Sequence, residues 1–270
     1  MSDAAPTFAV CVKFVPDTAQ LRADAQTRAP RLDEAPLRIS TFDEHALEQA
    51  VQLKEAHGGR VEVLSLVAAP PPEELVLKLL AMGADRVCLV EEPTAHAADA
   101  LATARVLSAA LQKLGAWELV LCGEGSIDTY ARQVGPRIAA ELAIPVLTHV
   151  TQLDREAESF TAHRGLEDRT EVVACAAPLL VAVGQEINQP RFPTVLQILG
   201  ASQKPTEVWH LADLGFPDDT SLEDWSGVVT TDIRAPEARR SGLVIDGSST
   251  AEVAEQLACE LFARGLVKLA

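Results

Sequence analysis

Short apolar runs alternate with helical patterns along the first two thirds of the chain, and this alternation constrains the fold most. Runs typical of buried strands occupy residues 8–15, 61–69, 86–91 and 118–122. Segments with apolar residues at helical spacing follow them at residues 44–59, 72–83, 97–115 and 129–143. Strands that are apolar throughout must be covered on both faces, as in a parallel sheet. The sequence therefore predicts an α/β fold, with a parallel sheet between two layers of helices.

The pattern changes after Pro145. Four strand-like pieces with short turns and no long helix between them follow, at residues 146–154, 158–165, 169–177 and 179–184. They predict an antiparallel extension at the sheet edge or a small separate β-section. From residue 184 onward the chain is rich in loop residues, and only residues 251–266 have a convincing helical pattern. Because so long a tail is unusual for a surface loop, we expect an arm that packs on another chain.

These patterns divide the chain into two parts. Residues 1–183 form the predicted α/β nucleotide-binding domain with its edge β-section, and residues 184–270 form the predicted partner-recognition loop and arm. A formal net charge of -16 argues against a nucleic-acid partner. The five cysteines are scattered, so we expect no metal site. The chain has no long uncharged apolar run and no signal-peptide pattern at residues 1–14, so we expect a cytoplasmic protein without a membrane insertion.

The segment GEGSID, residues 123–128, follows the apolar run 118–122 and is the strongest candidate for a binding corner. Ligands of open parallel sheets bind beyond the carboxyl ends of the strands, and glycines let the backbone approach them closely. The segment is neither a Walker loop nor a GxGxxG motif, because Asp128 occupies the third glycine position. Asp128 is instead predicted to be the N-cap of the helix 129–143. Spacing alone leaves open a nucleotide corner or a simple turn.

Catalytic residues are hard to find in this sequence. A hydrolase or transferase that uses Ser126 would need a nearby histidine, and none follows in a suitable corner. A nucleotide-binding module of the universal-stress type is a second alternative with the same strand–helix alternation. Lys13, at the end of the first strand, is interpreted as solvated rather than as a phosphate ligand.

Five segments occur in an order that is similar to a known family: VCVKFVPDTAQLR, FDEHALEQAVQLKE, LLAMGADRV, LVLCGEGSIDTYARQVG and EINQPRFPTVLQILGASQKP. Together they resemble the β subunit of electron-transfer flavoproteins, including the nitrogen-fixation-associated branch and its bifurcating relatives. The resemblance implies a flavodoxin-like (adenine-nucleotide-hydrolase-like) fold and a heterodimer with an α subunit that carries the redox FAD. It implies an electron carrier between acyl-CoA-type dehydrogenases and a quinone reductase or similar acceptor, without catalytic residues of its own.

The resemblance also implies a nucleotide in this subunit, which is AMP in most members and a second FAD in bifurcating ones. The positions that match the family's pocket are Cys11, Ser40, Phe42, Asp43, Val67, Gly123, Gly125, Ser126, Ile127, Asp128, Thr129, Arg132, Gln133 and Val134. Glu124 stands where the family has a basic residue, and a negative charge disfavours two phosphates more than one. Arg132 would offset this charge if it turned inward. We therefore predict AMP, with FAD as the alternative.

The segment QPRFPTVLQIL resembles the family's recognition loop, which docks on dehydrogenases. Val195 matches its anchoring apolar residue, and Phe192 and Leu196 flank it. The resemblance implies that these side chains contact the partner. The alternative is that they pack on the protein's own core.

Overall fold

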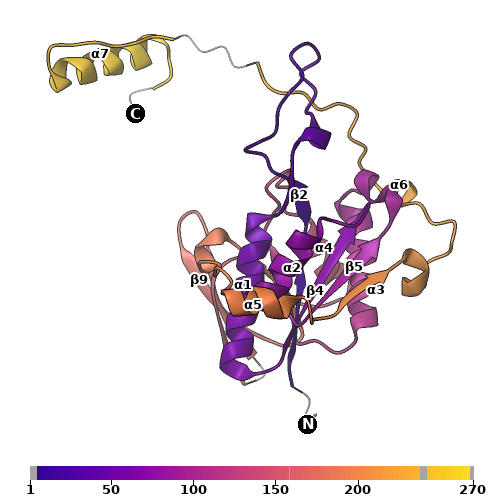
Figure 1. The fold of residues 1–270 in the computed structure, drawn as a ribbon. Helices are drawn as coiled ribbons and strands as arrows, with labels where there is room; N and C mark the ends of the chain where they lie inside the picture. Colours follow the sequence, from indigo (N-terminus) through magenta and orange to yellow (C-terminus); the bar gives the residue numbers. More distant parts are fainter. Residues whose placement is uncertain (1–4, 158, 238–241, 268–270) are drawn as a thin grey trace. The chain divides into compact units, whose positions relative to one another are not determined.

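The computed structural model describes residues 5–157, 159–237 and 242–267, and the chain divides into two compact units, Met1–Ile233 and Arg234–Ala270. The first unit contains the sheet and the helices that cover it (Figure 1).

Nine strands of the described residues form one sheet in the order β11-β5-β4-β1-β6-β10-β7-β8-β9. In chain order they are β1 (Thr7–Cys11), β4 (Arg60–Val67), β5 (Arg86–Glu91), β6 (Leu119–Gly123), β7 (Val146–Glu156), β8 (Ser159–Gly165), β9 (Thr170–Ala176), β10 (Leu179–Val183) and β11 (Thr206–Trp209). Neighbours from β11 to β7 pair in parallel, and β8 and β9 continue the sheet in antiparallel pairing. The predicted α/β class with an antiparallel edge is confirmed, and the arrangement is that of a flavodoxin-like fold.

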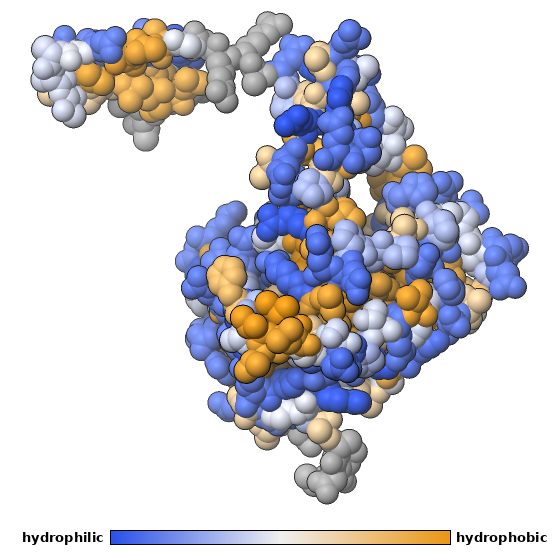
Figure 2. Space-filling view, viewed as in Figure 1, coloured by the Kyte–Doolittle hydropathy of each residue, from blue (hydrophilic) through white to orange (hydrophobic). Residues whose placement is uncertain are grey.

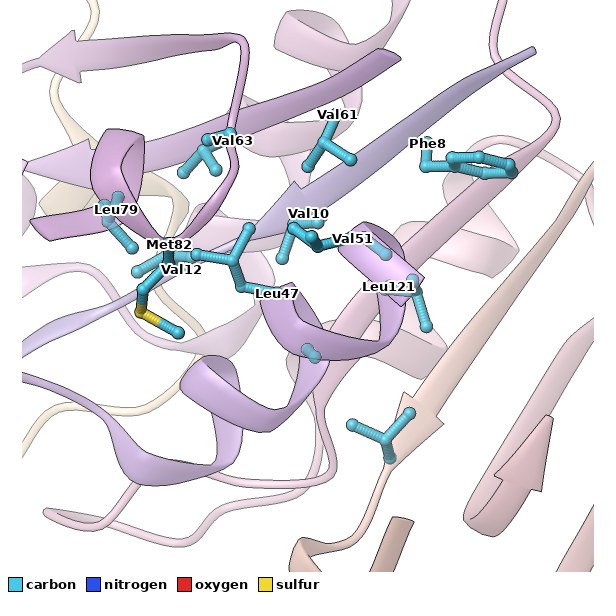
Figure 3. Close-up of a cluster of buried hydrophobic side chains, with 14 of the residues drawn as sticks. Phe8, Val10, Val12, Leu47, Val51, Val61, Val63, Leu79, Met82 and Leu121 are labelled. Atoms are coloured by element: carbon cyan, nitrogen blue, oxygen red, sulfur yellow. The ribbon is translucent and has the colours of Figure 1, made fainter. Parts of the chain in front are cut away.

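Two layers of helices cover this sheet. On one face lie α1 (Thr41–His57) and α2 (Glu73–Met82), and on the other α3 (Ala100–Leu114) and α4 (Val134–Glu141). Side chains of β1 alternate between the layers, since Val10 joins the α1–α2 side and Cys11 the α3–α4 side. Figure 3 shows Leu47, Val51 and Met82 pointing toward the strand residues of the first layer.

Three expectations about strands need correction. The predicted strand 8–15 breaks after Cys11, and β2 (Phe14–Pro16) pairs instead with β3 (Leu37–Ile39) as a separate antiparallel ladder, with the short η1 (Leu32–Glu34) before β3. The last of the four pieces after Pro145 is β10, which lies in the parallel part between β6 and β7 rather than at the edge. Its five residues are all buried, which explains its continuous apolar run.

The third correction concerns the loop-rich tail. Residues 185–225 contain η3 (Gln185–Ile187), α5 (Val195–Ala201), β11, η4 (Leu211–Leu214) and α6 (Leu222–Trp225), and η2 (Pro93–Ala97) lies between β5 and α3. The β11 strand extends the sheet beside β5, and Trp209, Leu211 and Leu222 are buried. These core residues follow no strand or helix period, so the sequence pattern did not reveal them. The division at residues 183 and 184 stays a prediction.

The second unit contains α7 (Thr250–Ala263), which lies within the predicted helical segment 251–266 apart from its first residue. Its N-cap is Ser249, whose hydroxyl accepts the Glu252 N–H at 3.3 Å. Packing of this unit on another chain stays a prediction. Among the described residues, no helix is both long enough and apolar enough to cross a membrane.

Candidate functional site

The strand order reverses beside β1, and this reversal locates the candidate site. The chain runs from β1 to β4 and β5 in one direction, and then returns to β6 on the other side of β1. Cys11 and Cys122 lie opposite each other at the carboxyl ends of β1 and β6. Open α/β sheets bind ligands beyond the carboxyl ends of the strands at such a reversal. GEGSID follows β6 and therefore lies at this point.

Asp43, in the first turn of α1, joins the ends of the two strands. Its carboxylate accepts the backbone N–H of Lys13 at 2.8 Å and the backbone N–H of Gly123 at 3.0 Å. The residue is buried. Burial raises the pKa of Asp43 to about 7, against the opposing effect of the two N–H donors. A single side chain therefore holds the segments after β1 and β6 on either side of the reversal.

Close packing at this edge requires glycine. A Cβ on Gly123 would lie 2.5 Å from the Phe42 Cβ and 2.7 Å from the Asp43 carboxylate. A Cβ on Gly135 would lie 2.8 Å from the Cys122 sulfur. The two glycines thus bring the loop against the start of α1, and α4 against β6.

The loop between β6 and α4 is not helical, which corrects the prediction of a helix over 129–143. Tyr130 and Arg132 have φ angles of 46° and 56°, far from helical values. The helix begins at Val134, so Asp128 is not its N-cap. The Asp128 carboxylate instead accepts the Lys13 ammonium at 2.6 Å. Lys13 is therefore ion-paired at the site rather than merely solvated.

Glu124 is enclosed by the loop that it begins. Its backbone N–H binds the Val183 carbonyl at 2.9 Å, and its side chain is only 14% exposed. The carboxylate accepts the Tyr130 hydroxyl and lies 3.2 Å from Nδ1 of His149. The hydrogen bond to Glu124 raises the pKa of the Tyr130 hydroxyl. The negative charge of Glu124 is thus engaged by side chains of the protein.

Tyr130 is also packed at the site. Its ring centroid lies 5.3 Å from that of Phe42, and the Arg132 guanidinium lies over the ring at 4.4 Å from its centroid. A Cβ on Gly125 would collide with the tyrosine ring. Sequence reasoning missed Tyr130 and His149 as site residues. The signal available for Tyr130 was that the chain's single tyrosine lies two residues after the GEGSID segment.

The N-terminus of α4 is suited to an anion. Its N-cap residue, Gln133, makes no side-chain capping bond, and the first turn carries no acidic residue. The N–H groups of Val134 and Gly135 have no acceptor within the helix. The Gln133 amide oxygen accepts the Arg137 guanidinium at 3.0 Å, so this side chain is turned toward its own helix. Such a terminus binds phosphate oxygens readily.

Other predicted residues form the walls of this edge. Burial raises the pKa of the Cys11 thiol to about 12, so the thiol is an unreactive part of the wall. Val67 ends β4 next to β1, and is buried. The hydroxyl of Ser40, fully buried before α1, has no hydrogen-bond partner within the part of the chain that the structure describes. A buried polar atom without a partner fits a site that binds a polar ligand.

The remaining loop residues lie between Gly125 and α4. Ser126 Oγ lies 3.2 Å from Thr129 Oγ1, and the Ser126 hydroxyl also binds Asp128. Neither neighbour is the imidazole base that a serine nucleophile requires. Ile127 is half-buried and Arg132 is exposed. The structure therefore gathers the predicted site residues at one edge of the sheet. Their contact with a nucleotide stays a prediction.

The predicted docking residues lie outside this site. Phe192, Val195 and Leu196 are 93%, 72% and 81% exposed, so they do not pack in the core of the described chain. Ile198 and Leu199 extend the same apolar surface. Figure 2 shows hydrophobic side chains gathered over α5. Partner contact at this surface stays a prediction.

Comparison with known proteins places the chain among characterised families. Residues 32–214 match the electron transfer flavoprotein domain family. The chain is 32% identical to the caffeyl-CoA reductase-Etf complex subunit CarD of Acetobacterium woodii, over 93% of this chain and 96% of that protein. It is 33% identical to the electron transfer flavoprotein subunit beta of Thermoanaerobacterium thermosaccharolyticum, over 88% of this chain and 92% of that protein. With the flavodoxin-like sheet described above, these matches show that the chain belongs to the electron-transfer flavoprotein family as a β subunit.

Proposed function

We propose that this chain is the β subunit of a heterodimer whose α subunit carries the redox FAD. The complex would carry electrons from acyl-CoA-type dehydrogenases to a quinone reductase or a similar acceptor. Family membership supports the electron-transfer role, and CarD is named as part of a complex with a caffeyl-CoA reductase. In this proposal the chain shapes the surroundings of the flavin and docks partners, without breaking bonds itself. A cytoplasmic location stays part of the proposal.

The observation that carries a nucleotide role is the Asp43 bridge at the strand reversal. It fixes the ends of β1 and β6 at the place where an open sheet binds its ligand. The uncapped start of α4 supplies N–H donors for one phosphate, and the walls at Cys11 and Val67 suit an adenine ring. We propose AMP as the occupant. When bound, AMP supplies no redox chemistry, and it stabilises the fold by mass action.

A second FAD is the alternative, and one observation favours it. The case against two phosphates rests on the charge of Glu124, but that carboxylate is engaged by Tyr130 and His149. Arg132 stands beside them with its guanidinium exposed except for its contacts to Tyr130. The electrostatic cost of the second phosphate is therefore smaller than the sequence suggested. A flavin at this place would make the site a redox site.

We propose that the surface formed by Phe192, Val195, Leu196, Ile198 and Leu199 docks on the dehydrogenase. We call it the docking surface. Exposed apolar clusters of this kind mark sites of protein contact. CarD is named as a subunit of a complex with a caffeyl-CoA reductase, an enzyme that acts on a CoA thioester. This name supports an acyl-CoA dehydrogenase as the partner of the docking surface.

The test is to co-express the chain with an electron-transfer flavoprotein α subunit from the same organism, purify and denature the complex, and quantify the released FAD and AMP. One FAD and one AMP per heterodimer are expected. Two FAD and no AMP would replace AMP by a second flavin. A chain that purifies alone and releases no nucleotide would contradict the proposal.

A further inference from the structure

One face of α1 carries polar residues whose surroundings the fold and the candidate site do not explain. Thr41, His45, Glu48 and Glu55 are spaced by four, three and seven residues, so they lie along one side of the helix. Such a stripe is ordinarily solvated. Glu48 is instead only 3% exposed, although it is a charged residue.

The segment that follows β10 covers this stripe. The Gln185 amide donates to the Thr41 hydroxyl at 2.8 Å. The Asn188 amide donates to the His45 carbonyl at 3.0 Å, and its oxygen lies 3.2 Å from the His45 ring. Residues 185–191 therefore run along α1, toward the C-terminal half of the helix.

Arg191 ends this run between two carboxylates. Its guanidinium donates to Glu48 at 2.8 and 3.0 Å and to Glu55 at 2.5 and 2.9 Å. Its backbone N–H donates to Glu48 at 3.2 Å. Both carboxylates receive two side-chain donors, a geometry that the planar guanidinium allows and an ammonium group does not.

The ion pair between Arg191 and Glu48 is largely buried, so each charge depends on the other for compensation. The Glu48 side chain is 4% exposed, and Arg191 is the cation paired with it in the described residues. An ion pair of this kind contributes little net stability, but loss of one partner leaves a buried charge uncompensated. We therefore consider where this pair holds the chain rather than how much it adds to the free energy of unfolding.

The docking surface begins at the residue after Arg191. Its helix, α5, has seven residues, of which only Ala201 is buried, and a helix this short is not stable without outside contacts. The Thr194 capping box and packing against α2 support it locally. The hydrogen bonds of Arg191 to Glu48 and Glu55 attach the chain to α1 just before α5 begins.

We infer that Arg191 is a positioning residue, which holds the docking surface in one place on α1 through Glu48 and Glu55. The inference about position rests on the contacts above. Its consequence for partner recognition rests on the docking role given under the proposed function.

Arg86 offers a matched control. Its guanidinium donates to the buried Glu62 at 2.7 Å and to the exposed Glu207 at 2.8 Å. Its side chain is 25% exposed, against 24% for Arg191. Arg86 joins β4, β5 and β11, and the bonds described for it include none to α1 or α5. Both arginines thus join a buried and an exposed carboxylate, although Arg86 gives each carboxylate one donor where Arg191 gives two.

The experiment measures hydrogen–deuterium exchange of residues 188–201 in the full chain as it is purified, for the wild type, Arg191→Ala, Arg191→Lys and Arg86→Lys. The Ile198 N–H, bound to the Thr194 carbonyl, is one reporter. Exchange in α5 should accelerate on the order of tenfold in Arg191→Ala and less in Arg191→Lys, and remain unchanged in Arg86→Lys. If Arg191→Ala does not fold, Arg191→Lys carries the test.

A kinetic measurement separates position from docking. The complex is used as the electron acceptor of its acyl-CoA-type dehydrogenase, and KM and kcat are measured for each variant. Faster exchange with a raised KM and an unchanged kcat supports both the inference and the docking role. Faster exchange without a kinetic change supports the inference and contradicts the docking role. Unchanged exchange in both Arg191 variants overturns the inference, and a raised KM in that case would make Arg191 a direct partner contact.

Discussion

The Asp43 carboxylate accepts the N–H of Gly123 at 3.0 Å, and that same approach leaves no room for a side chain on residue 123. The two residues are 80 positions apart in the chain and meet because β6 returns beside β1. The hydrogen bond and the absence of a Cβ are thus two aspects of one contact. The candidate nucleotide site is built around it.

Gly123→Ala should destabilise the fold through steric overlap at this contact. The added Cβ would lie 2.5 Å from the Phe42 Cβ, so α1 or the loop must shift. Overpacking of this kind costs about 1–3 kcal/mol in the free energy of unfolding. We expect lower stability in urea denaturation and loss of the bound nucleotide. Gly200→Ala is the control, since its Cβ would meet no atom within 4 Å. Equal stability of both variants would contradict the prediction.

Asp43→Asn should change the pH dependence of stability. The pKa of Asp43 is raised from 3.8 to about 7 in the folded chain, so the folded state holds a proton that the unfolded state has lost between these values. The stabilisation from this group is complete below pH 4 and is lost as pH rises to 7. The change across this window is on the order of 4 kcal/mol in the free energy of unfolding. Asparagine does not titrate, so this slope should disappear.

The measurement is urea denaturation of wild type and Asp43→Asn at several pH values from 4.5 to 8. Asp168→Asn is the control, because the Asp168 side chain is 75% exposed. It should retain the slope of the wild type. A wild-type slope that survives in Asp43→Asn would rule out Asp43 as its source.

Tyr130→Phe should destabilise the loop between β6 and α4 while keeping the aromatic packing of the ring. The variant keeps the ring that packs on Phe42 but removes the hydroxyl that binds Glu124 and accepts Arg132. Hydrogen bonds to charged groups contribute about 1.5–3 kcal/mol, and exposure of the tyrosine reduces this. We expect the bound nucleotide to dissociate about 3- to 10-fold faster. Nucleotide retained after repeated gel filtration gives the rate, and an unchanged rate would show that the hydroxyl does not support the site.

Leu196→Glu should impair docking and leave the fold intact. The side chain is 81% exposed, so surface substitution should change the free energy of unfolding by less than about 0.5 kcal/mol. A charge within an apolar contact should raise the KM of the dehydrogenase for the complex about tenfold or more. Val172→Glu, on the exposed face of β9, is the control. The docking role would be wrong if both variants gave the wild-type KM.

The strand–helix alternation could be predicted from sequence because the spacing of apolar residues in each element follows which of its faces are buried. An apolar run such as RVCLVE is buried on both faces and became β5 over the predicted residues. The apolar stripe of residues 44–59 likewise became α1, because one side of a helix must face the core. Cys11 and Asp43 were proposed for the site through family resemblance, and Gly123 also from its place after an apolar run; their contact with a nucleotide stays a prediction.

Expectations failed where a distant segment determined the local structure. The residues TYARQ contain no glycine or proline and suit a helix, but Tyr130 packs on the distant Phe42 and binds Glu124 of its own loop, which holds them in a loop. The short TEVW segment has little pattern of its own, and it is a strand because β5 offers a free edge.

The sequence by itself thus determined most of the strands and helices in the first two thirds of the chain, and that the sheet is parallel with an antiparallel extension. The tertiary structure decided that β6 and then β10 follow β1 in the sheet, that Asp43 spans two strand ends, and that Arg191 is held by α1. The physical reason is that the periodicity of apolar residues shows which face of a segment is buried. It carries no information about which distant segment covers that face.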